Sequence, residues 1–171
     1  CSNYDLWDLY LYLRSAEAHN IVFCPDFDYD ACRLVPRITH FDAGNGEITT
    51  VTDVSCGERS YRWERKVRID GNTVTFTDNA VSGQPLKWQA DFHLHPHHIK
   101  QTAADTVKQL TDDFLLTVST SLPCSVVLTP VINGENRRDY CDCIGCRGEG
   151  TGFGLVTIFE FADRQNLGGK S

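Results

Sequence analysis

Strict alternation of apolar and polar residues is the feature that most limits the folds open to this chain. In LKWQADFHLH (residues 86–95), every second side chain from Leu86 to Leu94 is apolar and the others are polar. YRWERKVRI (61–69) repeats the pattern, and Arg65 alone breaks its apolar face. Successive side chains of a strand point to opposite faces, so this pattern predicts strands with one buried face.

Other stretches predict further strands. Ile38 to Cys56 alternates on both sides of AGNGE, a turn-forming sequence, and predicts a β-hairpin. Strands are also expected at 4–14, 73–77 and 153–161, together with a second hairpin built from 114–120 and 124–131. Residues 133–152 are polar and rich in cysteine and glycine, which predicts a loop.

The apolar residues of one stretch, 99–111, recur with a longer period than those of the strands. Ile99, Ala103, Val107 and Leu110 recur every three or four residues, which predicts a short helix over 99–111. About eight or nine strands, mostly antiparallel, with one inserted helix favour a sandwich or a closed barrel. The length of 171 residues suits a single domain, 1–171.

Composition narrows the class of protein. A net charge of −7 argues against a nucleic-acid partner, which needs a basic face. The chain has no methionine and no run of apolar residues that spans a bilayer, so we expect a processed, secreted protein whose signal peptide has been removed. The even number of cysteines predicts disulfides in an extracellular setting. These cysteines are Cys1, Cys24, Cys32, Cys56, Cys124, Cys141, Cys143 and Cys146.

Large aromatic residues on the predicted inner faces are the candidate ligand-binding residues. Such a set forms either a packed core or the wall of a small-molecule pocket, and Arg65 among them favours a pocket with one polar anchor. The candidates are Tyr10, Tyr12, Trp63, Arg65, Phe76, Trp88, Phe92 and Phe159.

The histidines of FHLHPHH offer a second candidate site. His93 and His95 share one strand face and are able to chelate a metal, but that face is the polar one, which favours a solvent-exposed cluster. The sequence has no nucleophile elbow, phosphate loop or dinucleotide fingerprint. We therefore expect neither an enzyme nor a cofactor.

Several of these stretches together resemble the lipocalins, most nearly the invertebrate ones. The resembling segments are Trp7 before LYLYLR, the hairpin THFDAGNGEITTVTDVSC, the paired strands in DFLLTVSTSLPCSVVLTPV, and LVTIFEFADR, whose Arg164 would pack on Trp7. The resemblance implies a disulfide-rich, eight-stranded antiparallel up-and-down barrel with one inserted short helix. It also implies a carrier or scavenger that binds a small hydrophobic ligand or an amine inside the barrel.

A second hypothesis needs no cavity. The chain would be a secreted inhibitor or immune modulator that binds a protein partner. Its contact surface would be the acidic loop 24–32 and the cysteine-rich residues 133–152.

Overall fold

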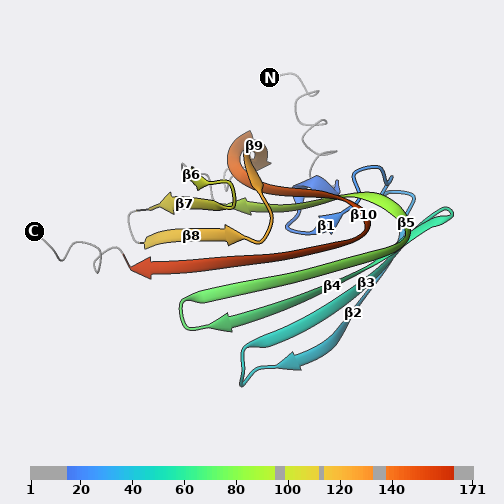
Figure 1. The fold of residues 1–171 in the computed structure, drawn as a ribbon, viewed down its shortest axis with the longest axis horizontal. Coiled ribbons are helices and arrows are strands. Elements are labelled where there is room, and N and C mark those ends of the chain that lie inside the picture. Colours follow the sequence, from blue (N-terminus) through green and yellow to red (C-terminus); the bar gives the residue numbers. More distant parts are fainter. Residues whose placement is uncertain (1–14, 95–98, 112–113, 133–137, 164–171) are drawn as a thin grey trace, which may run out of the picture.

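A computed structural model describes residues 15–94, 99–111, 114–132 and 138–163. These residues are almost entirely strands (Figure 1). The elements are the 3₁₀ turn η1 (Ala16–Ala18) and strands β1 (Val22–Phe23), β2 (Arg33–Asp42), β3 (Glu47–Cys56), β4 (Arg59–Asp70), β5 (Thr73–Leu94), β6 (Ile99–Ala103), β7 (Thr106–Leu110), β8 (Phe114–Thr120), β9 (Cys124–Ile132) and β10 (Arg138–Asp163). Within the described residues, no helix is long and apolar enough to cross a membrane.

The two longest strands, β5 and β10, fold back on themselves. Phe76 and Phe92 both belong to β5, and sixteen residues of straight strand would separate them by about 50 Å. Their ring centroids nevertheless lie 5.6 Å apart. The bend falls at Gly83–Pro85 in β5 and at Gly150–Gly152 in β10, where the pairing between the two strands shifts register.

The fold-back produces two layers from one antiparallel sheet. The larger layer has the order β2-β3-β4-β5-β10-β8-β7-β6. The last part of β5, residues 86–94, and the first part of β10, residues 138–150, form the smaller layer, with β1 and β9 at its edges. In Figure 1, β1 and β9 lie above β8 and the red C-terminal half of β10, and β4, β3 and β2 lie below them. The buried core lies between them and includes Trp88, Phe92, Ile144, Leu155 and Val118.

The sheet does not close, so the predicted barrel is wrong. On one side β6 meets the smaller layer, since the amide of Ile99 donates to Asp142 and the side chain of Gln101 donates to the Cys124 carbonyl. On the other side β2 is an uncovered edge: Ile38 is 65% exposed and Phe41 69% exposed. A chain of ten strands that pair in this order forms an open sandwich, and the prediction of a mainly antiparallel β protein is confirmed.

Three element predictions also need correction. Residues 99–111 form the hairpin β6–β7 instead of a helix, because Val107 and the equally buried Gln109 alternate with exposed residues and pair with β8. Strands β8 and β9 exist as predicted but do not pair with each other: each lies beside a different half of β10. Of the predicted loop 133–152, residues from Arg138 onward belong to β10: residues 138–146 pair with β9, and residues 142–150 and Gly152 pair with β5.

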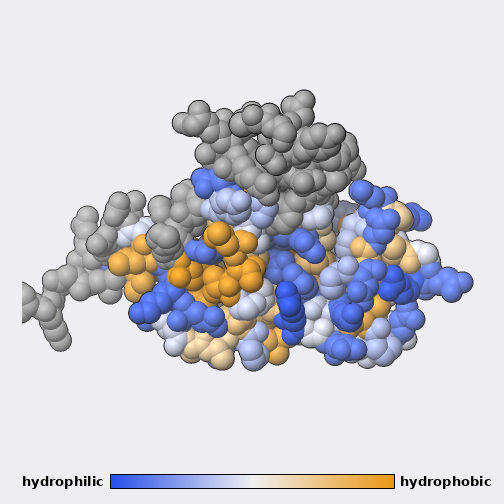
Figure 2. Space-filling view, turned by 90° about the horizontal axis from the view of Figure 1, so that it is seen from above, coloured by the Kyte–Doolittle hydropathy of each residue, from blue (hydrophilic) through white to orange (hydrophobic). Residues whose placement is uncertain are grey.

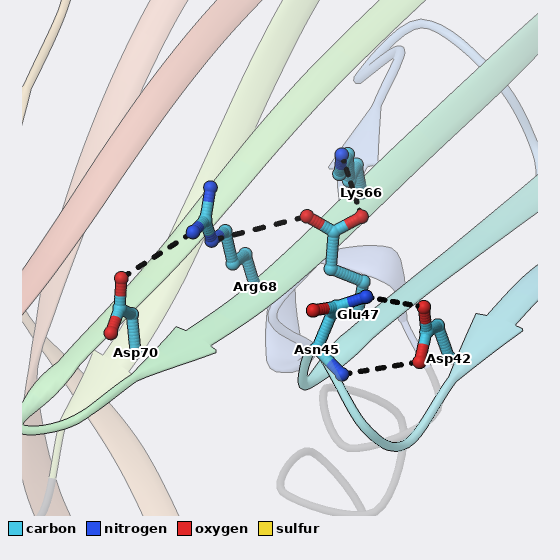
Figure 3. A network of polar contacts seen from close by, with 6 residues as sticks. All are labelled: Asp42, Asn45, Glu47, Lys66, Arg68 and Asp70. Carbon is cyan, nitrogen blue, oxygen red and sulfur yellow. Dashed lines mark hydrogen bonds and ion pairs between the residues drawn. The ribbon is translucent and has the colours of Figure 1, made fainter.

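The predicted hairpin within residues 38–56 is confirmed as β2 and β3. Polar contacts fix its turn (Figure 3). The carboxylate of Asp42 accepts hydrogen bonds from the Gly44 and Asn45 amides and from the Asn45 side chain. Glu47 then pairs with Lys66 of β4 at 2.9 Å, so the turn is tied to the next strand.

Candidate functional site

A pocket of about 250 Å³ lies against the segment 15–30, which contains η1 and β1. This segment packs on the smaller layer, where Val22 and Phe23 pair with Ala90 and Gln89 of β5. The lining residues are Ser15, Ala16, Glu17, Phe23, Pro25, Phe27, Asp28, Tyr29 and Asp30. The pocket is therefore made by one short stretch of chain that a long strand holds in place.

Aromatic rings form the base of the pocket and brace one another. Phe23 and Phe27 are buried, and their ring centroids lie 6.5 and 6.2 Å from that of Tyr29. The Tyr29 hydroxyl accepts a hydrogen bond from the Cys24 amide at 2.8 Å and shares another with the Tyr61 hydroxyl at 2.9 Å. Burial raises the pKa of Tyr29 to about 12, so this hydroxyl stays neutral at physiological pH.

Carboxylates form the rim. Glu17, Asp28 and Asp30 are exposed, and the Asp30 amide donates to the Asp28 carboxylate at 3.2 Å. Tyr29 is the partly exposed ring of the three, since Phe23 and Phe27 are buried and the Arg59 guanidinium lies 4.6 Å from the Phe27 ring centroid. A partly exposed ring below carboxylates suits a ligand with an apolar ring face and with hydroxyl or ammonium donors at its edge. Negatively charged ligands are disfavoured at such a rim because like charges repel.

A second hollow of about 490 Å³ shares Pro25 with the first. It is lined by Lys87, Trp88, Gln89, Arg147, Gly148 and Glu149 as well. Lys87 also contacts Asp26 of the acidic loop at 3.7 Å, so the two hollows lie at the same end of the molecule. Figure 2 shows that the surface toward β1 is mostly hydrophilic, whereas apolar side chains gather toward β6–β9.

The described aromatic residues of the proposed ligand-binding set belong to the core cluster or pack against it. Phe76, Phe92 and Phe159 contact one another at centroid distances of 5.5 to 5.6 Å. Trp88 is 1% exposed and packs on Tyr61 and on Phe153. Tyr10 and Tyr12 lie outside the described residues. The prediction of an interior carrier site remains a prediction, and every described member of the set packs against its neighbours.

Arg65 has a partner inside the protein. Its Nε and Nη2 atoms donate to the fully buried carboxylate of Asp78 at 2.7 and 3.0 Å. Trp63 donates to the same carboxylate at 2.7 Å, and the guanidinium lies over the rings of Trp63, Phe76 and Phe92. The sequence did not predict that Asp78 is the partner of Arg65. The two residues lie directly opposite each other in the β4–β5 register.

The histidine site is not assembled in the described part of the chain. His93 is half-buried, and its backbone amide donates to the Asn20 side-chain oxygen at 2.7 Å. Burial lowers the pKa of His93. His95 lies outside the described residues, and no group of three metal-ligating side chains occurs among those described.

The seven described cysteines carry free thiols, while Cys1 lies outside the described residues. Cys141, Cys143 and Cys146 are buried in β10, where neighbouring residues point to opposite faces of the sheet. Cys32 and Cys56 are the pair whose thiols lie near each other. No disulfide therefore joins any two of the seven cysteines that the structure describes.

The pocket itself was not predicted. Its aromatic residues, Phe23, Phe27 and Tyr29, fall in or beside the acidic loop 24–32, for which the sequence suggested a contact surface with a protein partner and not a pocket. The one available signal was their density: three rings in seven residues next to carboxylates are unusual for a loop that only faces water.

No family model and no curated protein matches this chain. Among solved structures, it is similar to a heparinase III (TM-score 0.77, 10% identity, covering 95% of this chain and 26% of that one). It is also similar to the heparan sulfate lyase HepC of Pedobacter heparinus (TM-score 0.76, 12% identity, 96% and 27% covered). A further match is a putative kojibiose phosphorylase from the human microbiome (TM-score 0.58, 12% identity, 87% and 22% covered).

These similarities establish the sandwich fold. The chain spans about a quarter of the length of the heparin and heparan sulfate lyases that it matches. None of the three is described as a lipocalin.

Proposed function

We propose that this chain is a β-sandwich module of a carbohydrate-processing protein and that the pocket at residues 15–30 binds part of a saccharide. The observation that carries the proposal is the pocket itself, with its base of aromatic rings and its rim of carboxylates. Sugar rings have apolar C–H faces that pack on aromatic side chains, and their hydroxyl groups donate hydrogen bonds to carboxylates.

The similar structures also support the proposal of a module in a carbohydrate-processing protein. Their names describe a heparinase III, a heparan sulfate lyase and a putative kojibiose phosphorylase, and the matched region is a minor part of each longer chain. This support is an analogy between folds, because a fold alone does not determine a function, so the proposal is argued from the residues of the pocket.

The negative charge at the pocket favours neutral or amine-bearing saccharides over acidic ones. The chain carries −7, and Glu17, Asp28 and Asp30 concentrate negative charge at the pocket. A sulfated or uronic-acid polymer would meet repulsion at this rim, whereas an ammonium group would be attracted and would also interact favourably with the aromatic faces. We therefore assign to this pocket a neutral or amine-bearing saccharide, with glucosamine oligomers as the best probe.

Isothermal titration calorimetry of the chain with three oligosaccharides tests this assignment. The probes are a glucosamine oligomer, a neutral glucose oligomer and a heparin-derived oligomer of equal length. We expect the glucosamine oligomer to bind most tightly and its affinity to fall as salt is raised, because the charge attraction is screened. Preference for the heparin oligomer would overturn the charge argument, and silence with all three would overturn the saccharide proposal.

A double variant localises the effect. Asp28→Asn with Asp30→Asn is expected to weaken glucosamine binding about tenfold, since each exposed charge pair contributes up to about 1 kcal/mol. The matched control, Glu64→Gln with Glu160→Gln, removes the same charge from exposed positions on β4 and β10 that do not line the pocket. Equal losses in the two variants would show that only net charge matters.

A further inference from the structure

We infer that Cys32 and Cys56 form an oxidisable thiol pair whose disulfide fastens the pocket loop to the sheet. Cys32 ends the acidic loop 24–32, and Cys56 ends β3. Both thiols donate to the same acceptor, the Asp28 carbonyl oxygen, at 3.1 and 3.6 Å. Two sulfur atoms that share one acceptor lie close to each other.

Backbone register makes a bond between them feasible. Arg33 of β2 lies opposite Ser55 of β3, so one further step along the antiparallel ladder brings Cys32 opposite Cys56. Residues directly opposite in such a ladder have Cβ atoms about 4.5–5.5 Å apart, and a disulfide needs about 3.5–4.5 Å. Closing the bond thus requires a shift of about 1 Å at the end of a strand.

Accessibility distinguishes this pair from the other cysteines. The side chains of Cys32 and Cys56 are partly exposed, and Glu58 beside them is fully on the surface. Cys124 and Cys146 are also opposite each other in the β9–β10 register, but Cys146 is completely buried. An oxidant in solution reaches the first pair and is kept from the second.

The reaction is a thiol–disulfide exchange with a low-molecular-weight disulfide such as oxidised glutathione. One protein thiolate attacks the small disulfide, which releases one glutathione thiol and leaves a mixed disulfide. The second protein thiolate then attacks the protein sulfur and releases the second glutathione. Two protein thiols are oxidised to one disulfide, their two protons pass to the two glutathione thiolates that leave, and one small disulfide is thereby reduced to two thiols.

The pKa of the attacking thiol affects the rate of this exchange. Burial, followed by the neighbouring Cys56 thiol, raises the pKa of Cys32 to about 12. Only the thiolate is a good nucleophile, so oxidation is slow at neutral pH and accelerates as the pH rises.

The consequence of the bond concerns the pocket. Asp28, Tyr29 and Asp30 lie just before Cys32 and contribute to the pocket lining. A covalent link from Cys32 to β3 restricts the opening of this loop, because the cross-link removes the extended conformations of the chain.

Peptide mapping of the full chain after incubation with oxidised and reduced glutathione tests the inference. We expect the first disulfide to join Cys32 to Cys56, with a mass loss of two hydrogens and two fewer titratable thiols. Amide hydrogen exchange in residues 26–31 should slow by at least about tenfold on oxidation.

Two variants serve as controls. Cys32→Ser should abolish the first disulfide, whereas Cys124→Ser should leave it unchanged. A first disulfide between other cysteines, or stable glutathione adducts on Cys32 and Cys56 in a folded chain, would overturn the inference. So would exchange rates in the loop that oxidation leaves unaltered. None of these outcomes depends on whether a saccharide binds.

Discussion

Asp78 illustrates how a single residue decides what a neighbouring residue does. It is fully buried and accepts three hydrogen bonds, two from Arg65 and one from Trp63. The arginine that interrupts an apolar strand face is therefore a structural group of the core, where a charge is tolerated only when paired. Sequence alone predicted which face Arg65 occupies, but it did not reveal the partner, because the β4–β5 register is set by long-range pairing.

Replacing Asp78 by alanine should lower the free energy of unfolding by about 3–5 kcal/mol, since it leaves a buried guanidinium without its counter-charge. Asp53→Ala is a matched control: Asp53 also contacts two arginines, Arg37 and Arg62, but at the surface. That change should cost much less, because the ion pairs of Asp53 are exposed to solvent. Urea unfolding measures both, and equal losses would contradict the structural role of the buried pair.

The carboxyl group of Asp91 makes the stability of the folded protein depend on pH. Burial raises its pKa to about 6, compared with about 3.9 in an unfolded chain. Between pH 4 and 6 the folded state thus binds more protons than the unfolded state, so this residue makes stability fall as the pH rises through that window. The effect amounts to at most about 3 kcal/mol.

The comparison with Asp91→Asn isolates this contribution. Other carboxylates, among them Asp53, have lowered pKa values and change stability in the opposite direction, but they are common to both proteins. We expect the stability of the wild type relative to Asp91→Asn to decline from pH 4 to 6.5 in thermal or urea unfolding. A flat difference over that range would refute the assignment.

At the scale of elements, the strands with clean alternation were predicted correctly and those shaped by pairing partners were not. Strand β4 shows the expected pattern, with Tyr61 buried and Arg62 exposed. The 99–111 segment misled because Gln109 occupies a buried position opposite Leu116 of β8, where an apolar residue is the usual choice. Residues 99–111 form a hairpin because they pair with β8, and the local apolar period carries no information about this pairing.

The β2–β3 turn offers a test of a local element. Gly46 has φ +64°, and a Cβ atom there would lie 2.6 Å from the Ile69 carbonyl oxygen of β4. Gly71 has a similar φ of +56°, but a Cβ atom at this position would meet nothing within 4 Å. Both glycines avoid the strain of a left-handed backbone, whereas only Gly46 also permits a close approach to another strand.

Gly46→Ala should therefore destabilise the protein more than Gly71→Ala. The second change costs about 1–2 kcal/mol for the left-handed conformation alone, and the first adds the displacement of β4. Chemical denaturation of the two variants compares them directly. Equal losses would mean that the turn moves away from Ile69 without cost.

At the scale of the whole molecule, the sequence correctly predicted a mainly antiparallel β protein but wrongly predicted that its sheet closes into a barrel. Lipocalin-like spacing and alternation are shared by barrels and sandwiches, because both bury one face of each strand. The difference lies in the bends of β5 and β10, which double each strand over the core and leave β2 as an open edge. The aromatic residues expected around a cavity consequently pack between two layers.

The same architecture locates the pocket. Because β5 bends, residues 86–94 form a second layer whose edge pairs with β1, and this pairing supports the 15–30 segment. Nothing in the local sequence of that segment predicts a support so distant along the chain. The saccharide assignment therefore depends on the three-dimensional arrangement of the rings and carboxylates.

The most direct test is an amide chemical-shift map of the ¹⁵N-labelled chain titrated with a glucosamine oligomer. We expect the largest shifts within residues 15–30 and in the adjoining part of β5, and we expect them to shrink in the Asp28→Asn, Asp30→Asn double variant. Shifts centred on β2–β4 or on β8–β9, or no shifts at saturating ligand, would contradict the saccharide assignment.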